Sequence, residues 1–290
     1  MPERIVIGTR GSRLALAQAV KVREILEGEG FEAELRIIKT SGDIKKDMPL
    51  HEFRGAGAFV REIDLALRRG EIDIAVHSLK DVPTDRVEGT VISGVLERES
   101  PCDAFISGNG KKFSEIDENS IIGTSSLRRR AMVRKLRKDV RIENLRGNID
   151  TRLKKLEGGH YDGIFLAEAG LIRIGWNERI RYERMDPHVF VPSANQGIIA
   201  VASRMDDREK FGFMNHEKTF REAMVERYVI KELGIGCAIP AGVYARTCGS
   251  RIRLLCEILS LEGDVKFRID EKIEYGSEDE IREILKGVEI

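Results

Sequence analysis

Short apolar runs alternate with helical patterns through the first two thirds of the chain. Residues 4–8 are predicted to form a strand, and the segment after them repeats apolar residues at helical spacing from Leu16 to Leu26. Further strands are predicted at 34–39 and at 72–76. Strands and helices that alternate in this way are typical of an α/β fold with parallel strands.

A second set of alternating elements begins near Cys102. Strand-like runs lie at 121–123, 140–143 and 163–166, and helical patterns separate them. The run at 198–203, IIAVAS, is predicted to cross back into the first set. Two similar α/β lobes are therefore expected.

The pattern changes in the last quarter of the chain. Residues 217–233 are predicted to form one long helix, 241–274 to form antiparallel strands, and 278–286 to form a closing helix. This arrangement predicts a small α+β domain. The expected division is domain 1 at 1–96 and 196–213, domain 2 at 97–195, and domain 3 at 214–290.

Composition is ordinary for a soluble globular protein, since 41% of the 290 residues are hydrophobic. No apolar run approaches the roughly 18 residues that a membrane span needs, and the charged start MPERIVIGTRGSR is unlike a signal peptide. We therefore expect a cytoplasmic protein. The four cysteines form no CxxC pair and the five histidines no HxxxH spacing, so no metal site is predicted. Cys102, Cys248 and Cys256 are expected to be buried free thiols.

Positive charge is concentrated in one segment of a chain whose formal charge is zero. Residues 121–155 carry twelve Lys or Arg against three Asp or Glu. The arginines follow apolar runs, and the ends of parallel strands converge on one crevice, so we expect a single pocket that binds an anion. Guanidinium groups grip carboxylates and phosphates alike. A polycarboxylate, a phosphorylated metabolite and a nucleic acid remain open as ligands.

Polar side chains follow the predicted strand at 72–76 directly. His77, Ser78, Lys80 and Asp81 stand where ligands of open α/β sheets bind. Asp81 is either a turn residue or a carboxylate placed to protonate a leaving group or to stabilise a cation. His77 is expected to be a structural histidine.

Two further segments have the character of functional loops. Residues 42–57 show no helical or strand period, which favours a lid or binding loop over a disordered surface loop. Cys237 lies among glycines and a proline in LGIGCAIPAG, where a thiol is accessible to a reaction partner. Spacing alone slightly favours a structural thiol there, and a nucleophile or attachment point is the alternative.

Eight segments, in order along the chain, say more than their spacing does: GTRGSRLALAQ at 8–18, TSGD at 40–43, GAFVREI at 57–63, HSLKDVPT at 77–84, GTSSLRRR at 123–130, LRGNIDTRL at 145–153, LAEAGLIRIG at 166–175 and GIGCAIPAG at 234–242. Together they closely resemble the hydroxymethylbilane synthase family, also called porphobilinogen deaminase. The resemblance implies a cytosolic, monomeric transferase of tetrapyrrole biosynthesis, with no nucleic-acid or membrane partner. It would condense four porphobilinogen molecules head to tail and release ammonia at each step.

The resemblance also implies a fold, a cofactor and roles for individual residues. The first two domains would be similar to the lobes of type II periplasmic binding proteins. A dipyrromethane cofactor would be joined to Cys237 through a thioether. Asp81 would be the catalytic carboxylate that assists loss of the amino group and steadies the azafulvenium cation. The cofactor's acid groups would be met by Ser78, Lys80, Ser126, Arg128 and Arg129, and the substrate and growing chain by Arg10, Phe59, Arg146, Arg152 and Arg173.

The chain departs from the family's pattern at two places. Ala56 stands where family members often have a lysine of the lid, and the usual GQG is Asn195-Gln196-Gly197. A non-catalytic, two-lobed receptor for a polyanion is the alternative function, and it would need neither Asp81 nor Cys237. Nucleic-acid binding ranks third because the basic segment lacks interleaved aromatic residues.

Overall fold

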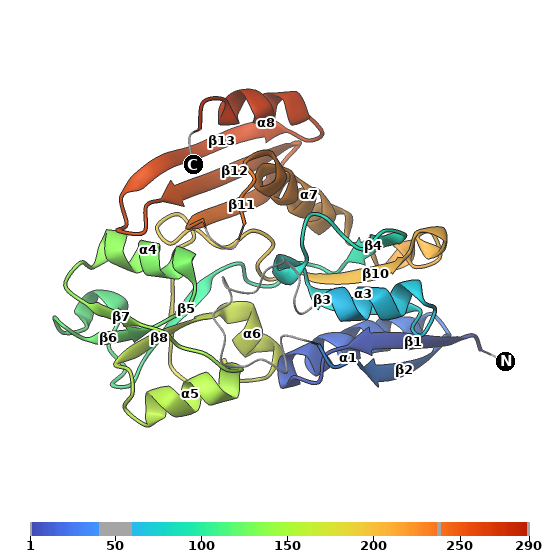
Figure 1. Ribbon diagram of the computed structural model, residues 1–290, viewed down its shortest axis with the longest axis horizontal. Coiled ribbons are helices and arrows are strands. Elements are labelled where there is room, and N and C mark those ends of the chain that lie inside the picture. The colour runs from blue at the N-terminus through green and yellow to red at the C-terminus, as the bar shows by residue number, and fades with distance from the viewer. Residues whose placement is uncertain (1, 41–59, 237–238, 289–290) are drawn as a thin grey trace. The chain divides into compact units, whose positions relative to one another are not determined.

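The computed structural model describes residues 2–40, 60–236 and 239–288 (Figure 1). The chain divides into two compact units, residues 1–99 with 198–221 and residues 100–197 with 222–290. Three predictions from the sequence fall outside the described residues. They are the lid or binding loop at 42–57, which includes Ala56, and the site residues Phe59 and Cys237.

The first lobe is a five-stranded sheet in the order β2-β1-β3-β10-β4. Its strands are β1 (Arg4–Thr9), β2 (Glu32–Ile37), β3 (Ile74–Ser78), β4 (Thr90–Val95) and β10 (Ile199–Arg204). β1 pairs in parallel with β2 and β3, whereas β10 runs antiparallel to β3 and β4. The predicted crossing of residues 198–203 back into this lobe is therefore confirmed. The expected strands at 34–39 and 72–76 are each offset by two residues from the observed β2 and β3.

Two helices cover opposite faces of this sheet because side chains alternate along each strand. Helix α1 (Arg13–Gly28) places Val22 and Leu26 in the cluster that contains Ile5 and Ile7 of β1. Helix α3 (Arg61–Arg68) instead joins the cluster with Val6, from the other face of the same strand.

The second lobe repeats this order with β7-β6-β8-β5-β9. Its strands are β5 (Asp103–Ser107), β6 (Ile121–Gly123), β7 (Arg141–Glu143), β8 (Gly163–Ala167) and β9 (Glu183–Arg184). The helices are α4 (Leu127–Leu136), α5 (Ile149–Glu157) and α6 (Glu168–Arg173). In both lobes three parallel strands are followed by one antiparallel strand, β10 or β5, inserted fourth in the sheet. The expectation of two similar α/β lobes is confirmed.

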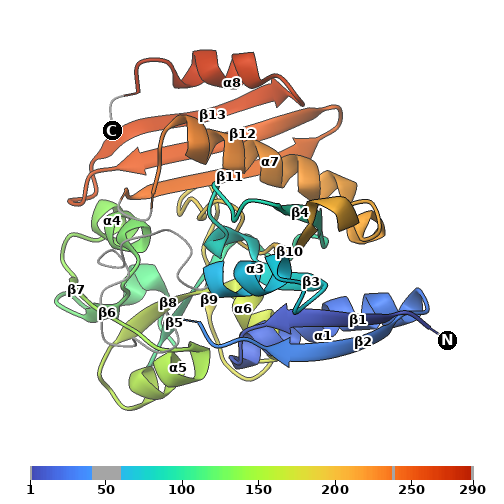
Figure 2. The same cartoon turned by 45° about the vertical axis from the view of Figure 1, so that its right-hand side comes forward.

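The C-terminal elements form a small antiparallel sheet with two helices on one face (Figure 2). They are α7 (Glu217–Glu232), β11 (Ala241–Cys248), β12 (Arg251–Leu259), β13 (Val265–Glu274) and α8 (Glu278–Leu285). This confirms the expected α+β region. It belongs to the same compact unit as the second lobe, and the division into three domains at the boundaries given above stays a prediction.

The other face of the C-terminal sheet packs against α4. Leu255 and Leu259 of β12 join the core cluster of the second lobe. The buried Glu257 accepts from Lys135 Nζ at 2.5 Å and from Arg268 Nη1 at 2.6 Å. A buried carboxylate is stable only when it is paired in this way. The end of α4 is therefore fixed to β12.

The cysteines follow the expected pattern at two positions of three. Cys102 and Cys256 are buried free thiols, as expected, but Cys248 is exposed. It is the last residue of β11, directly before the turn at Gly249, where φ is 65°. The expected burial of Cys248 is wrong because the strand has already left the sheet's core at that point.

Candidate active site

In the first lobe, four of the sequence-predicted residues lie at the carboxyl ends of β1 and β3. β1 and β3 are parallel neighbours, pairing Ile7 with Ile74. Arg10 follows the end of β1 directly and is half-buried, and Ser78 is the last residue of β3. Ser78 Oγ accepts a hydrogen bond of 2.8 Å from Gln18 Nε2 of α1.

Lys80 and Asp81 lie on the single 3-10 turn Leu79–Asp81 that continues β3. Leu79 is fully buried, and its amide donates to the carbonyl of Ile198 at 2.9 Å. Val82, at the other end of the turn, is buried too. Because the flanking residues are anchored inside, Lys80 and Asp81 are held on the surface, where both side chains are exposed. This arrangement suits groups that meet a ligand.

His77 has a structural role, as expected. Its Nε2 lies 3.1 Å from Asp64 Oδ1, and both side chains are buried. Asp64 Oδ2 is 2.9 Å from Nη2 of Arg86, whose side chain is only 9% exposed. Burial lowers the pKa of Arg86, and the charge of Asp64 opposes that shift. His77 thus ties β3 to α3 one residue before the site.

In the second lobe, the predicted residues follow the carboxyl ends of β6, β7 and β8. Ser126 caps α4, its Oγ accepting from the amide of Arg129 at 3.4 Å. Ser125 Oγ donates to the carbonyl of Leu145 at 3.0 Å, which joins the loop after β6 to the loop after β7. Arg146 and Arg173 follow β7 and β8 on the same sheet edge. The expected convergence of strand ends is found within this lobe.

Arg128 and Arg129 are buried and share one carboxylate. Asp103, which is fully buried at the start of β5, accepts from Arg128 Nη2 at 2.8 Å and from Arg129 Nε at 2.9 Å. Arg128 Nη1 also donates to the carbonyl of Val191 at 2.8 Å, and Arg129 Nη1 to that of Phe165 at 2.9 Å. Burial lowers the pKa of Arg128, and the Asp103 charge opposes this. Two guanidinium charges face one carboxylate, which leaves a net positive charge in the interior.

Asp103 was not among the residues singled out from the sequence. Asp103 is the charged first residue of an apolar run, DAFIS. If this run is a buried strand, the carboxylate needs a partner, so the sequence could have marked Asp103 as a paired buried acid. The partner's identity cannot be read from that signal, because Arg128 and Arg129 stand 25 and 26 residues away.

Arg152 lies in a surplus of positive charge. Its Nε donates to the carbonyl of Gly147 at 2.8 Å. Burial of its guanidinium, together with the charges of Arg129 and Arg146, lowers its pKa to about 10. A carboxylate near this group would reverse the shift, because an opposite charge favours the ionised form. The chemistry of this cluster therefore fits an anionic ligand.

Arg173 ends α6 and is half-buried. Its Nη2 donates to the carbonyl of Gly197 at 2.7 Å. Gln196 belongs to the Asn195-Gln196-Gly197 segment, where the sequence departs from the GQG pattern. Its Nε2 donates to the carbonyl of Pro101 at 2.7 Å. The segment therefore holds its place by backbone and amide contacts inside this unit.

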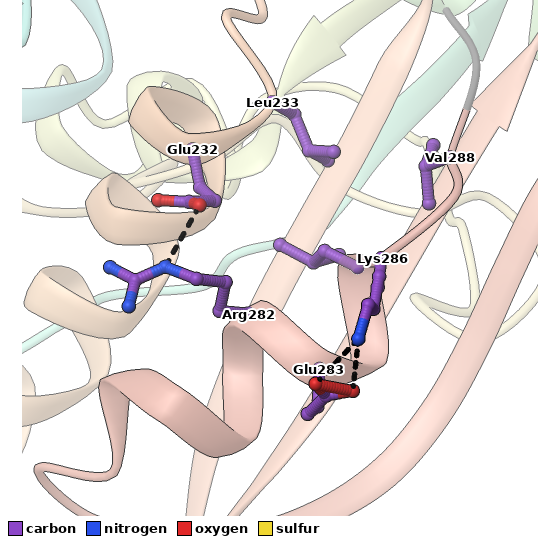
Figure 3. A pocket seen from close by; sticks show the side chains of 7 residues that line it. Glu232, Leu233, Arg282, Glu283, Lys286 and Val288 are labelled. Carbon is purple, nitrogen blue, oxygen red and sulfur yellow. Dashed lines mark hydrogen bonds and ion pairs between the residues drawn. The ribbon is translucent and has the colours of Figure 1, made fainter.

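A surface groove of about 590 Å³ lies between the end of α7 and α8 (Figure 3). Arg282 Nε donates to Glu232 Oε1 at 3.1 Å, and Lys286 Nζ to Glu283 Oε1 at 3.0 Å. Its charged groups pair with each other, and none of the sequence-predicted site residues that the structure describes lines it. The groove is therefore no candidate for the active site.

Within residues 2–40, 60–236 and 239–288, no group of three or more His, Cys, Asp or Glu is placed to hold a metal ion. Within the same ranges, no helix is long and apolar enough to cross a membrane.

Arginines gathered at the carboxyl ends of parallel strands are typical of α/β proteins that bind anionic small molecules. Comparison with known proteins shows to which family within this class the chain belongs. The family model described as "Porphobilinogen deaminase, dipyromethane cofactor binding domain" matches residues 5–211, and the one described as "Porphobilinogen deaminase, C-terminal domain" matches 220–286. The chain belongs to the porphobilinogen deaminase family, and the resemblance inferred from its motifs is confirmed.

Individual relatives agree with this assignment. A probable porphobilinogen deaminase of Archaeoglobus fulgidus is 58% identical over 271 residues, covering 93% of this chain and 92% of the relative. The porphobilinogen deaminase of Syntrophobacter fumaroxidans is 40% identical over 274 residues, covering 92% and 88%. Among solved structures, a periplasmic substrate-binding protein of an ABC transporter from Coxiella burnetii is 14% identical with a TM-score of 0.44, covering 77% of this chain and 94% of that one.

Proposed function

We propose that this protein is a hydroxymethylbilane synthase that condenses four porphobilinogen molecules head to tail and releases ammonia at each step. The observation that carries the proposal is the cationic cluster around Arg152, in a chain that belongs to the porphobilinogen deaminase family. Porphobilinogen and its oligomers carry many carboxylates, and such a cluster neutralises them. The cluster alone would also suit a polyanion receptor, but membership of an enzyme family argues against that alternative.

The dipyrromethane cofactor fits the residues of the second lobe. Residues 5–211 match the domain named for this cofactor. When bound, the cofactor supplies the pyrrole carbon to which the first substrate is joined. The residues proposed to meet its acid groups are Ser78, Lys80, Ser126, Arg128 and Arg129. We further propose that a thioether to Cys237 anchors it.

The buried Arg128–Arg129 pair would act mainly as a fixed positive field. The guanidinium groups of these residues donate to Asp103 and to backbone carbonyls. Such preorganised groups need no rearrangement when a charged ligand arrives. One net positive charge remains after pairing with Asp103, and it favours a bound carboxylate.

Asp81 would be the catalytic carboxylate. Its turn is anchored on both sides by buried residues, Leu79 and Val82, so its side chain is exposed but its backbone is fixed. A carboxyl group can protonate the departing amino group and then, as a carboxylate, stabilise the cation that forms. Arg10, Phe59, Arg146, Arg152 and Arg173 would bind the substrate and the growing chain. We also propose that the enzyme acts as a monomer in the cytoplasm.

An intact-mass spectrum of the purified protein tests the proposal most directly. The expected result is a mass increased by two pyrrole units, which Cys237→Ser loses and the matched variant Cys248→Ser keeps. The loaded protein should then convert porphobilinogen to hydroxymethylbilane with release of ammonia. A receptor would show the bare mass and no ammonia. An increment that persists in Cys237→Ser would refute the thioether assignment alone.

A further inference from the structure

A hydrogen bond joins two helices that each carry a predicted substrate-binding arginine. Trp176 Nε1 donates to Asp150 Oδ1 at 2.9 Å. Asp150 lies in the first turn of α5, two residues before Arg152, and Trp176 follows α6, three residues after Arg173. The two helices thus have a directional link close to both arginines.

The end of α6 fixes the position of Trp176. The amide of Trp176 donates to the carbonyl of Leu171 at 2.9 Å, and the amide of Gly175 to that of Ile172 at 3.1 Å. Gly175 has a φ of 70°. This is the Schellman arrangement, in which a glycine in the left-handed region ends the helix and the next residue bonds back into it. Arg173 is therefore held at a set place relative to the indole of Trp176.

The start of α5 fixes Asp150 in the same way. Asn148 caps the helix, its Oδ1 accepting from the amide of Thr151 at 2.9 Å. Arg152 lies one turn after this cap, and its Nε bonds to the carbonyl of Gly147 at 2.8 Å. Asp150 and Arg152 therefore belong to one rigid turn.

We propose that Trp176 is a positioning residue for chain elongation, because its bond to Asp150 sets the separation of Arg152 and Arg173. This inference rests on the proposed function. Trp176 also packs at the edge of the apolar cluster that contains Leu153 of α5 and Leu171 of α6. Apolar contacts are non-directional and allow two helices to shift against each other, whereas a hydrogen bond fixes distance and angle. Loss of the bond leaves the core but loosens the spacing of the two guanidinium groups.

The expected consequence is confined to the later steps of the reaction. The hydrogen bonds of the Arg128 and Arg129 guanidinium groups described above go to Asp103 and to the carbonyls of Val191 and Phe165, not to Trp176 or Asp150. Cofactor assembly should therefore survive when the bond is lost. Binding of substrate should weaken, because arginines that hold carboxylates must be correctly spaced to do so.

Three variants separate positioning from mere stability. Trp176→Phe keeps an aromatic ring in the core but lacks the N–H donor, and Asp150→Ala removes the acceptor. Asp150→Asn is the matched control, since its amide oxygen still accepts. Each variant is assayed for KM and kcat with porphobilinogen, and for the ladder of enzyme-bound intermediates by mass spectrometry. Trp176 is the chain's one tryptophan, so its emission reports the hydrogen bond in wild type, Asp150→Asn and Asp150→Ala without any turnover.

We expect KM to rise roughly tenfold in Trp176→Phe and Asp150→Ala, within the 10²-fold that small misplacements cost. Intermediates should accumulate, the cofactor increment should stay complete, and Asp150→Asn should resemble wild type. The emission of Asp150→Ala should shift. Unchanged KM and ladder in folded Trp176→Phe would overturn the proposal, as would an equal loss of cofactor assembly in all three variants. If wild type and Asp150→Asn both fail to add pyrrole units, the proposed function itself is refuted, and the positioning role falls with it.

Discussion

Asp103 and Arg128 form a buried ion pair, with 2.8 Å between Oδ2 and Nη2 and side-chain exposures of 0% and 6%. The same carboxylate serves Arg129 at 2.6 Å. A carboxylate with no access to water depends wholly on such partners, and the two arginines depend on it. The two buried guanidinium groups of α4 are therefore held in place by the carboxylate of Asp103.

Replacing this acid should destabilise the protein strongly. Asp103→Asn leaves two buried guanidinium groups without a counter-charge, and breaking a buried pair in this way costs roughly 3–5 kcal/mol. Urea denaturation of the cofactor-free protein measures the loss. Asp139→Asn is the matched control, because it breaks the surface pair with Arg137 and should have little effect. Equal losses in both variants would mean that Asp103 is no more important than a surface acid.

Arg152 should show the opposite balance between stability and function. Its folded pKa of about 10 lies below the ordinary value of an arginine, so the charged form is disfavoured in the folded state. The destabilisation is complete below pH 10, where both states are protonated, and is relieved as pH rises through about 10. At pH 7, Arg152→Gln should therefore raise the melting temperature of the cofactor-free protein, yet stall elongation after the cofactor has formed.

The control for this prediction lies on the same helix. Lys154 is exposed on α5, so Lys154→Gln removes the same charge outside the cluster and should change neither the melting temperature nor the ladder of intermediates. Arg128→Gln and Arg129→Gln should instead impair cofactor assembly itself. A lower melting temperature for Arg152→Gln would show that its contacts, such as the bond to Gly147, outweigh the repulsion.

The described cysteines should differ in reactivity. Burial, together with the charge of Glu257, raises the pKa of Cys256 to about 12. At pH 8 only about one in 10⁴ of these thiols is ionised, and the thiolate is the reacting form. Burial raises the pKa of Cys102 as well, whereas Cys248 is exposed. In Cys237→Ser, iodoacetamide at pH 8 should add one group, absent from Cys237→Ser/Cys248→Ser. Rapid addition of further groups to the folded protein would contradict this.

A close contact links the start of β11 to the carbonyl group that Arg128 binds. A Cβ on Gly242 would lie 2.6 Å from the carbonyl oxygen of Val191, the atom that accepts from Arg128 Nη1. Backbone cannot yield cheaply, so Gly242→Ala should lower the free energy of unfolding by about 1–3 kcal/mol, as overpacking does. Gly28→Ala, where a Cβ meets nothing within 4 Å, is the control. A neutral Gly242→Ala in urea denaturation would mean that β11 can move away from Val191.

The sequence pattern located the lobes and the strand ends because buried strands must be apolar and their ends must be polar. It placed β6 at 121–123 correctly, for example, and predicted the return of β10 to the first sheet. It did not identify β4, whose run TVISGV contains a serine and a glycine, the glycine lying against Asn215. Its boundaries for β2 and β3 slipped by two residues, since apolar residues continue beyond each hydrogen-bonded segment.

The partners of charged side chains could not be predicted from the sequence. The Asp103 pair joins β5 to α4 only because β5 is inserted antiparallel into the second sheet, and that insertion has no local signal. The bond from Trp176 to Asp150 likewise joins residues 26 apart. Motifs therefore supplied the residues that we propose for the site, whereas the contacts that orient them required the fold.

The last prediction concerns Asp81, the proposed acid of the cycle. Ammonia leaves readily only when the amino group is protonated, and the cation left behind needs a fixed negative charge nearby. One carboxyl group can serve both needs by giving up its proton as the bond breaks. Asp81 suits this role because its side chain is exposed while Leu79 and Val82 anchor its turn.

Asp81→Asn keeps the size and hydrogen bonding of this side chain but removes its charge and its transferable proton. The fold should survive, because the side chain is exposed, while turnover falls by roughly 10²- to 10⁴-fold, the usual contribution of a positioned acid or base. Asp81→Glu should retain part of the activity, since only the reach differs. Asp85→Asn removes an exposed charge four residues away and should be nearly silent. The measurement is single-turnover ammonia release by folded, cofactor-loaded enzyme. Release by Asp81→Asn at nearly the wild-type rate would make Asp81 a turn residue and place the catalytic acid elsewhere.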